Sequence, residues 1–178
     1  MAGNINYIIY SIGLVIGLCI LLIIIKLINR KRVMIVVLII SIPCFILCQT
    51  YFWNFTFNSY VKSYLFSSEV YLCELDNNLK NITITLPKRT VFKGKEDGCS
   101  PFYFTYISET EFQSFYEKEL TRLKTSELIQ NYYFIQEGVS EQKNRSGFFV
   151  ELATGANIVI SFQAKNVNHL AITYVRDN

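Results

Sequence analysis

Few residues of this sequence have the types and spacing that catalysis or metal binding requires. The only histidine is His169, and no cysteine or acidic residue stands beside it. It falls on a predicted strand with parity opposite to Leu170, so we interpret it as a partly exposed strand residue rather than a base or a ligand. Glu117 and Glu119 fall on a predicted amphipathic helix, where such carboxylates normally face solvent. The sequence therefore predicts no catalytic, cofactor-binding or metal-binding residues.

Short motifs that carry chemistry are also missing from the sequence. Gly94 with Lys95 lacks the glycine spacing and the hydroxyl of a phosphate loop, and neither G-x-S-x-G nor H-E-x-x-H occurs. Cys44 and Cys48 share a helix face, but two thiols without a third ligand indicate packing rather than a metal site. We predict that the protein is not an enzyme. An envelope enzyme with an unrecognised site is the third of three functional alternatives.

The five cysteines divide between two kinds of sequence. Cys19, Cys44 and Cys48 lie in long apolar runs, whereas Cys73 and Cys99 lie in the more polar remainder of the chain. Two cysteines in an oxidising compartment most simply form a disulfide. Their spacing is not C-x-x-C, which argues against redox catalysis. We predict a structural disulfide between Cys73 and Cys99 that closes a loop of about 27 residues.

Two apolar runs occupy most of the first 53 residues. Residues 7–25 and 33–53 contain no Asp, Glu, Lys or Arg, and each is long enough for a helix that crosses a bilayer. Residues 1–6 carry no charged side chain, which argues against a cleaved signal peptide. The connector, residues 26–32, carries four cations: Lys26, Arg30, Lys31 and Arg32. We predict an uncleaved transmembrane hairpin whose first partner is the lipid bilayer.

The positions of the cations predict how this hairpin is oriented. Lys and Arg accumulate on the cytoplasmic side of membrane spans, so the connector should lie inside and both chain termini outside. Aromatic residues, which favour the membrane interface, occur at both predicted outer ends: Tyr7, Tyr10, Tyr51, Phe52 and Trp53. The sequence therefore predicts a multi-pass membrane protein whose C-terminal part faces the periplasm or the cell exterior.

The source of the chain is indicated only by composition. Its Asn, Ile and Lys content favours an AT-rich bacterial genome, and hence the inner membrane as its location. Asn54, Asn81 and Asn144 each begin an Asn-x-Ser/Thr sequon on the predicted outer side. They would carry glycans only in a eukaryotic secretory pathway.

The net charge of +3 does not indicate a nucleic-acid partner. The connector contributes four positive charges, and residues 54–178 hold 13 Lys or Arg against 14 Asp or Glu, a net charge of −1. A nearly neutral domain lacks the basic surface that nucleic-acid binding requires. The slightly basic isoelectric point therefore reflects the predicted topology.

The sequence of residues 69–178 predicts an α+β domain with a mainly antiparallel sheet and one principal amphipathic helix. A stalk at 54–68 is predicted to join this domain to the hairpin. The helix should begin near Ser108, which forms a capping box with Glu111. Apolar residues then recur at helical spacing: Phe112, Phe115, Tyr116, Leu120 and Leu123. Period-two alternation predicts strands at residues 82–86, 148–152, 158–162 and 170–174, with further candidates at 102–107 and 131–136. Thr154-Gly155 and residues 166–168 are the predicted turns between the last three strands.

Two features of the apolar runs bear on packing. Gly13 and Gly17 form G-x-x-x-G, which lets helix backbones approach closely, either within the hairpin or between copies in a homo-oligomer. Pro43 should kink the second span, and Ser41 could satisfy the freed backbone groups. The runs contain few polar groups, which favours an anchor over a channel or transporter.

Consecutive aromatic residues are the strongest indication of a binding surface. Tyr132 and Tyr133 have opposite parity on one predicted strand, as do Phe148 and Phe149 on another, so some of these side chains should point away from the core. Tyr132, Tyr133 and Phe149 are the predicted protein-binding residues, because exposed aromatic side chains anchor interfaces. A sheet covered on both faces would explain the same pattern.

These observations lead to a functional hypothesis. The sequence favours a non-enzymatic, membrane-anchored protein whose outer domain binds another protein, and most specifically an immunity or inhibitor protein against a secreted toxin. The alternative is an accessory or assembly subunit that docks onto a larger membrane complex through its hairpin. A sensor is less favoured, because a seven-residue connector leaves no room for an output domain.

Overall fold

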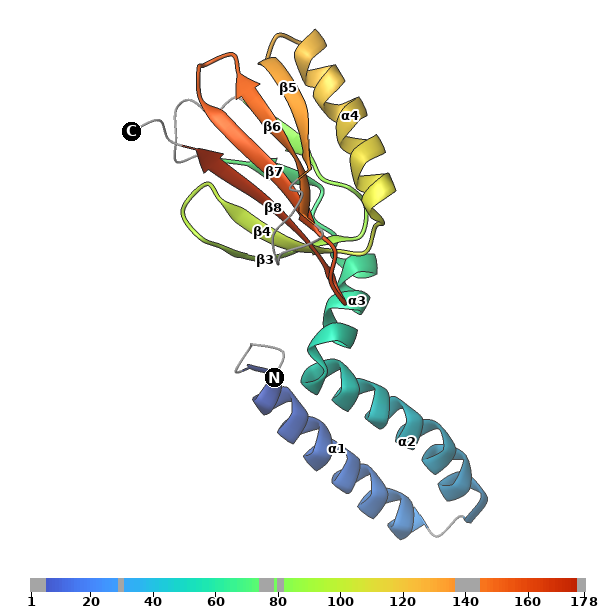
Figure 1. The fold of residues 1–178 in the computed structure, drawn as a ribbon. Helices are drawn as coiled ribbons and strands as arrows, with labels where there is room; N and C mark the ends of the chain where they lie inside the picture. Colours follow the sequence, from blue (N-terminus) through green and yellow to red (C-terminus); the bar gives the residue numbers. More distant parts are fainter. Residues whose placement is uncertain (1–5, 29–30, 74–78, 80–81, 137–144, 176–178) are drawn as a thin grey trace. The chain divides into compact units, whose positions relative to one another are not determined.

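The computed structural model describes residues 6–28, 31–73, 79, 82–136 and 145–175, and within them the fold is α+β with four helices and a mainly antiparallel sheet (Figure 1). This confirms the predicted α+β class and the mainly antiparallel sheet. The chain divides into two compact units, Met1–Val61 and Lys62–Asn178, which are described separately below.

The first unit contains two long apolar helices, α1 (Asn6–Ile28) and α2 (Lys31–Trp53). Both are long and apolar enough to cross a membrane, and they include the predicted spans 7–25 and 33–53. Of the four predicted topology residues, Lys26 lies in the last turn of α1, whereas Lys31 and Arg32 begin α2. Arg30 lies outside the described residues.

A polar cluster joins α1 to α2. The Ser11 hydroxyl donates to Gln49 Oε1 at 2.7 Å, and the Trp53 indole N–H lies 3.1 Å from Ser11 Oγ and 3.0 Å from Gln49 Oε1. Near the same end of the pair, the Tyr7 ring stacks on Phe52 with centroids 5.6 Å apart. These side chains are among the few polar and aromatic ones in the two helices, and their contacts fix the register of α1 against α2.

Helix α3 (Phe55–Leu65) follows α2 after a single residue, Asn54. The Asn54 side-chain oxygen accepts a hydrogen bond from the Phe57 backbone N–H at 2.9 Å, which is an N-cap contact. The predicted stalk at 54–68 is therefore helical over most of its length.

The second unit is built around a six-stranded antiparallel sheet with the strand order β3-β4-β8-β7-β6-β5 (Figure 1). Its strands are β3 (Thr90–Lys95), β4 (Pro101–Thr105), β5 (Ile129–Gln136), β6 (Arg145–Leu152), β7 (Asn157–Gln163) and β8 (Asn168–Val175). A separate antiparallel pair consists of β1 (Val70–Leu72) and β2 (Thr83–Thr85). Strand β8 pairs with both β4 and β7, so it joins the early and late parts of the sheet.

The predicted strands correspond to β2, β4, β5, β6, β7 and β8, whereas β1 and β3 were not predicted. The three residues of β1, Val70–Leu72, are all apolar and so show no alternation. In β3 the pairing register shifts between Phe92 and Gly94, and this irregularity interrupts the alternation of apolar and polar residues. Of the predicted turns, Gly155 lies between β6 and β7 with φ of 86°, a conformation that favours glycine.

Helix α4 (Glu109–Thr125) begins one residue after Ser108, as the capping box predicts. The Glu111 carboxylate accepts from the Ser108 backbone N–H at 2.7 Å, and the Ser108 hydroxyl oxygen accepts from the Glu111 backbone N–H at 3.2 Å. These bonds from Ser108 lower the pKa of Glu111. The capping residues therefore fix the first turn of the helix.

The apolar face of α4 forms the centre of the core. Phe112, Tyr116, Leu120 and Leu123 are all completely buried, and the Phe112 ring stacks on Phe162 with centroids 5.0 Å apart. Residues of the β1–β2 pair and both disulfide cysteines belong to the same core cluster. Helix α4 and the β1–β2 pair thus cover the face of the sheet that carries Phe148, Ile160 and Ile172.

The buried Tyr116 hydroxyl has no hydrogen-bond partner among the described residues. Burial, followed by the nearby Tyr103 and Glu119, raises the pKa of Tyr116 well above its usual value. An unsatisfied buried hydroxyl costs about 1–3 kcal/mol, so Tyr116→Phe is expected to raise the free energy of unfolding by about 1 kcal/mol.

The free energy of unfolding of Tyr116→Phe is measured by urea unfolding, and Tyr71→Phe is the control. The Tyr71 hydroxyl is also buried but donates to the Cys99 carbonyl at 2.8 Å, so its removal should lower stability by about 1 kcal/mol. Equal losses in the two variants would contradict the assignment of Tyr116 as unsatisfied.

Glu119 connects α4 to β2 and corrects one sequence expectation. Its carboxylate accepts from the Thr85 backbone N–H at 2.9 Å and from two guanidinium nitrogens of Arg122 at 2.8 and 2.9 Å. The prediction that Glu117 and Glu119 both face solvent is wrong for Glu119, which is buried, and holds for Glu117, which is exposed. Hydrogen bonds from Arg122, followed by those from Thr85, lower the pKa of Glu119 to about 2 despite its burial.

This lowered pKa predicts a dependence of stability on pH. A carboxyl whose pKa is lower in the folded state stabilises the fold above its unfolded pKa, and that contribution is lost as the pH falls through the folded pKa. The stability difference between the wild type and Glu119→Gln is therefore expected to be largest above about pH 4.5 and to shrink toward about pH 2. Urea unfolding midpoints at pH 7 and pH 3 would measure it, and a difference that grew at pH 3 would contradict the prediction.

Candidate functional site

The structure separates the three predicted protein-binding aromatics onto two faces of the sheet. Tyr133 and Phe149 are register partners on β5 and β6, and their rings stack with centroids 5.0 Å apart. Tyr133 is 48% exposed, so this pair lies on the face opposite α4. Tyr132 points the other way: its hydroxyl lies 2.8 Å from Thr121 Oγ1 of α4, and its ring contacts Phe148. The alternation of residues along the strands thus predicted that the aromatic side chains divide between the two faces of the sheet. It did not predict which face α4 covers.

The face that carries Tyr133 and Phe149 contains an open hollow of about 280 Å³. Gly147 lies in it, and a Cβ placed there would be 2.6 Å from the Ile160 carbonyl oxygen of β7. The close approach of the β7 backbone therefore requires glycine at this position. The hollow is lined by Ile135, Arg145, Ser146, Gly147, Val159, Ser161 and Thr173.

His169 lies on this same face, in basic and aromatic surroundings. Its ring meets the Phe104 ring edge-on with centroids 5.0 Å apart, and the Lys93 ammonium lies 4.4 Å from the centroid of Phe104. Burial, followed by the charges of Lys93 and Lys165, lowers the pKa of His169. The imidazole is therefore mainly neutral at pH 7. The described residues contain no group of three or more His, Cys, Asp or Glu side chains that could hold a metal ion.

A second hollow, of about 410 Å³, lies between α4 and β5 on the other face of the sheet. Thr121, Lys124, Thr125 and Tyr132 line it. The Lys124 ammonium donates to the Asn131 side-chain oxygen at 3.1 Å, and Thr121 contacts Tyr132, so two polar contacts hold the helix beside the strand. We call this hollow, together with the adjacent open edge of β5, the α4–β5 groove.

Sequence reasoning missed the three helix residues of the α4–β5 groove. Thr121, Lys124 and Thr125 are exposed polar residues of an amphipathic helix, and nothing in their spacing distinguishes them from an ordinary solvated face. The feature of the sequence that could have indicated this site is in β5, where eight successive residues carry no charge.

The remaining predicted site residues lie elsewhere. Cys73 and Cys99 form a disulfide with their Cα atoms 5.3 Å apart, within the usual range for such bonds. At Gly13 and Gly17 an added Cβ would meet no atom within 4 Å, so neither glycine mediates a close contact between α1 and α2. Gly17 instead borders an apolar hollow of about 340 Å³ that Cys44 and Cys48 also line.

A comparison of the chain with known protein families, with curated proteins and with solved structures finds no match. The function is therefore inferred from the geometry of the two surfaces.

Proposed function

We propose that this is a non-enzymatic, membrane-anchored protein whose C-terminal domain binds another protein outside the cytoplasm. The observation that carries the proposal is the stacked pair of Tyr133 and Phe149 on an open face of the sheet, beside a hollow that a partner side chain could fill. Exposed aromatic side chains next to such hollows are typical anchors of protein interfaces. The disulfide and the two long apolar helices are consistent with an envelope location.

The proposed location is the bacterial inner membrane, with both termini and the C-terminal domain in the periplasm or outside the cell. The support is the position of Lys26, Lys31 and Arg32 at the ends of α1 and α2 that meet in the connector. Of the three sequons, Asn54 caps α3, and Asn81 and Asn144 lie outside the described residues.

The orientation is testable with engineered cysteines in a full-length chain whose Cys19, Cys44 and Cys48 are replaced by alanine. A membrane-impermeant thiol reagent added to intact spheroplasts should label Ala153→Cys, in the exposed turn between β6 and β7. It should label the connector variant Arg32→Cys only after lysis. The reverse pattern would overturn the proposed topology.

Within this proposal, the most specific function is immunity: a tethered domain that captures and inhibits a secreted toxin as it enters the envelope. The support is the small size of the domain together with its exposed aromatic pair. The test compares the full-length protein with a version whose α1–α2 hairpin is exchanged for an unrelated two-helix anchor. Each is captured from gently crosslinked membranes, and the bound proteins are identified by mass spectrometry. An inhibitor should retain the same exported partner after the exchange.

A second candidate is an accessory subunit that docks through its hairpin. The open space at Gly13 and Gly17 favours it, because small residues with no atom within 4 Å of an added Cβ let a further helix, from a larger complex or a second copy, approach closely. In the same experiment, this candidate predicts that only the native hairpin retrieves partners and that these are integral membrane proteins.

A further inference from the structure

The two edges of the six-stranded sheet are protected very differently. Strand β3, at one edge, carries Lys93 and Lys95 and has a register irregularity beside Gly94. Strand β5, at the other edge, has eight residues with no charge, no proline and no glycine. Charges and bulges are the usual means by which sheets prevent another strand from pairing with their edge. Among the described residues, the sheet is therefore protected at β3 and left unpaired at β5.

The backbone of β5 has hydrogen-bonding groups available for a partner. In an antiparallel ladder, alternate residues of an edge strand direct their N–H and C=O groups away from the neighbouring strand. Among the described residues, the backbone of β5 after Ile129 makes no hydrogen bond other than those of its ladder with β6. These outward groups are positioned to pair with one further strand.

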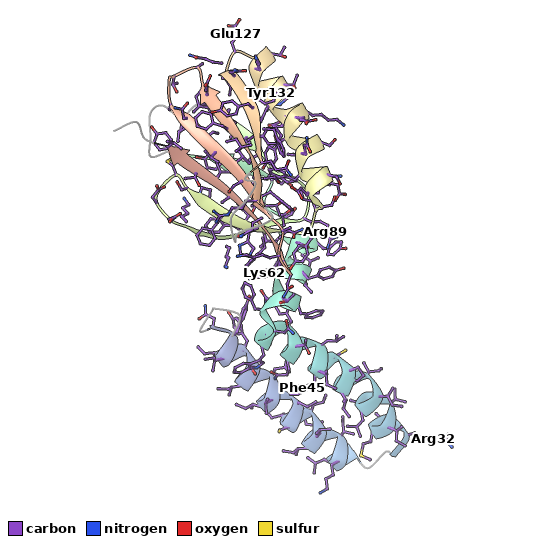
Figure 2. All side chains as sticks on the ribbon, in the orientation of Figure 1. Arg32, Phe45, Lys62, Arg89, Glu127 and Tyr132 are labelled. Atoms are coloured by element: carbon purple, nitrogen blue, oxygen red, sulfur yellow. A yellow bond between two sulfur atoms is a disulfide. The ribbon has the colours of Figure 1, made fainter. Side chains whose placement is uncertain are left out.

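Helix α4 adds side-chain contacts to this open edge. On one side of the helix, Glu119 accepts a hydrogen bond from Thr85 of β2. On another side, Thr121 and Lys124 contact residues of β5. Figure 1 shows α4 running beside β5, and Figure 2 labels Tyr132 between them. A strand added to β5 would thus lie along the hollow of about 410 Å³, within reach of Lys124.

A second copy of the chain fits this edge poorly. Two antiparallel β5 strands would be related by a two-fold axis normal to the sheet, so both α4 helices would lie on the same face. Both Lys124 side chains would also lie on that face beside the shared edge, where two like charges repel each other. A single extended segment has no helix of its own to accommodate. The geometry therefore favours a peptide segment over a second copy.

We propose that the α4–β5 groove binds an extended segment of the partner protein, which pairs with β5 as a seventh strand and places a carboxylate against Lys124. Strand addition of this kind obtains affinity from main-chain hydrogen bonds and specificity from side-chain contacts. Among the described residues that line the hollow, only Lys124 is charged. An acidic side chain in the bound segment would therefore form an ion pair with it. The inference rests on the proposed function, that the domain binds another protein, and adds a second contact surface to the face that carries Tyr133 and Phe149.

The probe for this proposal is a peptide selected from phage-displayed random dodecapeptides on the full-length protein in detergent micelles. Two matched variants separate the surfaces: Thr125→Trp fills the α4–β5 groove, and Thr173→Trp fills the hollow on the opposite face. Both threonines are exposed, and urea unfolding checks that each variant folds. Lys124→Glu reverses the charge in the groove without filling it.

The selected peptides are expected to contain an acidic residue, to bind Thr125→Trp and Lys124→Glu at least tenfold more weakly, and to bind Thr173→Trp normally. Their binding should also slow hydrogen exchange of the β5 amides. A selection that yields no peptide overturns the groove proposal. Loss of binding in Thr173→Trp alone also overturns it, but leaves the proposed protein-binding function intact on the opposite face. Failure of the proposed function itself is decided separately by the hairpin-exchange capture.

Discussion

Replacement of Phe112 by alanine is expected to lower the free energy of unfolding of the C-terminal domain by about 3–5 kcal/mol, the usual cost of truncating a buried aromatic side chain. Phe112 is completely buried, and its ring contacts Tyr116, Phe148 and Phe162 at centroid distances of 5.0, 5.9 and 5.0 Å. The truncation leaves a cavity where α4 meets β6 and β7. Small domains have total stabilities of about 5–15 kcal/mol, so this variant should be largely unfolded at moderate urea concentrations.

The measurement is pulse proteolysis of the full-length protein in detergent across a urea series. The single tryptophan, Trp53, lies in α2, so its fluorescence would not report on the C-terminal domain. Phe92→Ala is the matched control, because Phe92 is 48% exposed and its truncation should cost no more than about 1 kcal/mol. Equal unfolding midpoints for the two variants would contradict the assignment of Phe112 to the centre of the core.

Loss of the disulfide is the second large effect that we expect. The bond between Cys73 and Cys99 joins the end of β1 to the chain between β3 and β4 across 26 residues of sequence. Removing such a link restores conformational freedom to the unfolded chain, which should cost about 2–4 kcal/mol. Both cysteines are buried in the core cluster, so the bond also holds the β1–β2 pair against the sheet.

This prediction is measured with the double variant Cys73→Ala/Cys99→Ala, with and without a reducing agent. The wild type should lose stability on reduction and approach the double variant, which should not respond to the reductant. Cys19→Ala is the control, because this free cysteine lies in α1. A wild type that is equally stable in both conditions would show that the bond does not stabilise the domain.

Where local signals were strong, sequence reasoning predicted the elements well. Ser108 and Glu111 fixed the start of α4 because a capping box depends only on two residues three positions apart in the chain. The alternating residues of β6, β7 and β8 predicted three strands because one face of each is buried. Strand β3 was missed because its lysines and its irregularity, which protect an edge, also erase the alternating pattern.

The candidate site was less predictable because it depends on how α4 packs on the sheet. Sequence parity indicated that Tyr132 and Tyr133 point to opposite faces of the sheet, but only the packing of α4 decides which of them faces the helix. Thr121, Lys124 and Thr125 form a groove only because β5 lies beside them in the fold. For the same reason, the sequence alone could not show whether the G-x-x-x-G of Gly13 and Gly17 packs within the hairpin or against a partner. In the structure, an added Cβ at either glycine would lie more than 4 Å from any atom of α2.

The position of β8 between β4 and β7 has a consequence for biosynthesis. Of the eight strands among the described residues, β8 is translated last, and it begins 63 residues after β4 ends. At common elongation rates of about 5–20 residues per second, roughly 3–13 s pass between the two strands. During this interval the β3–β4 pair and the β5–β6–β7 strands have no strand to connect them into one sheet. The nascent domain should therefore depend most on chaperones in this interval, and a ribosome stalled before residue 168 would hold a chain that cannot complete its fold.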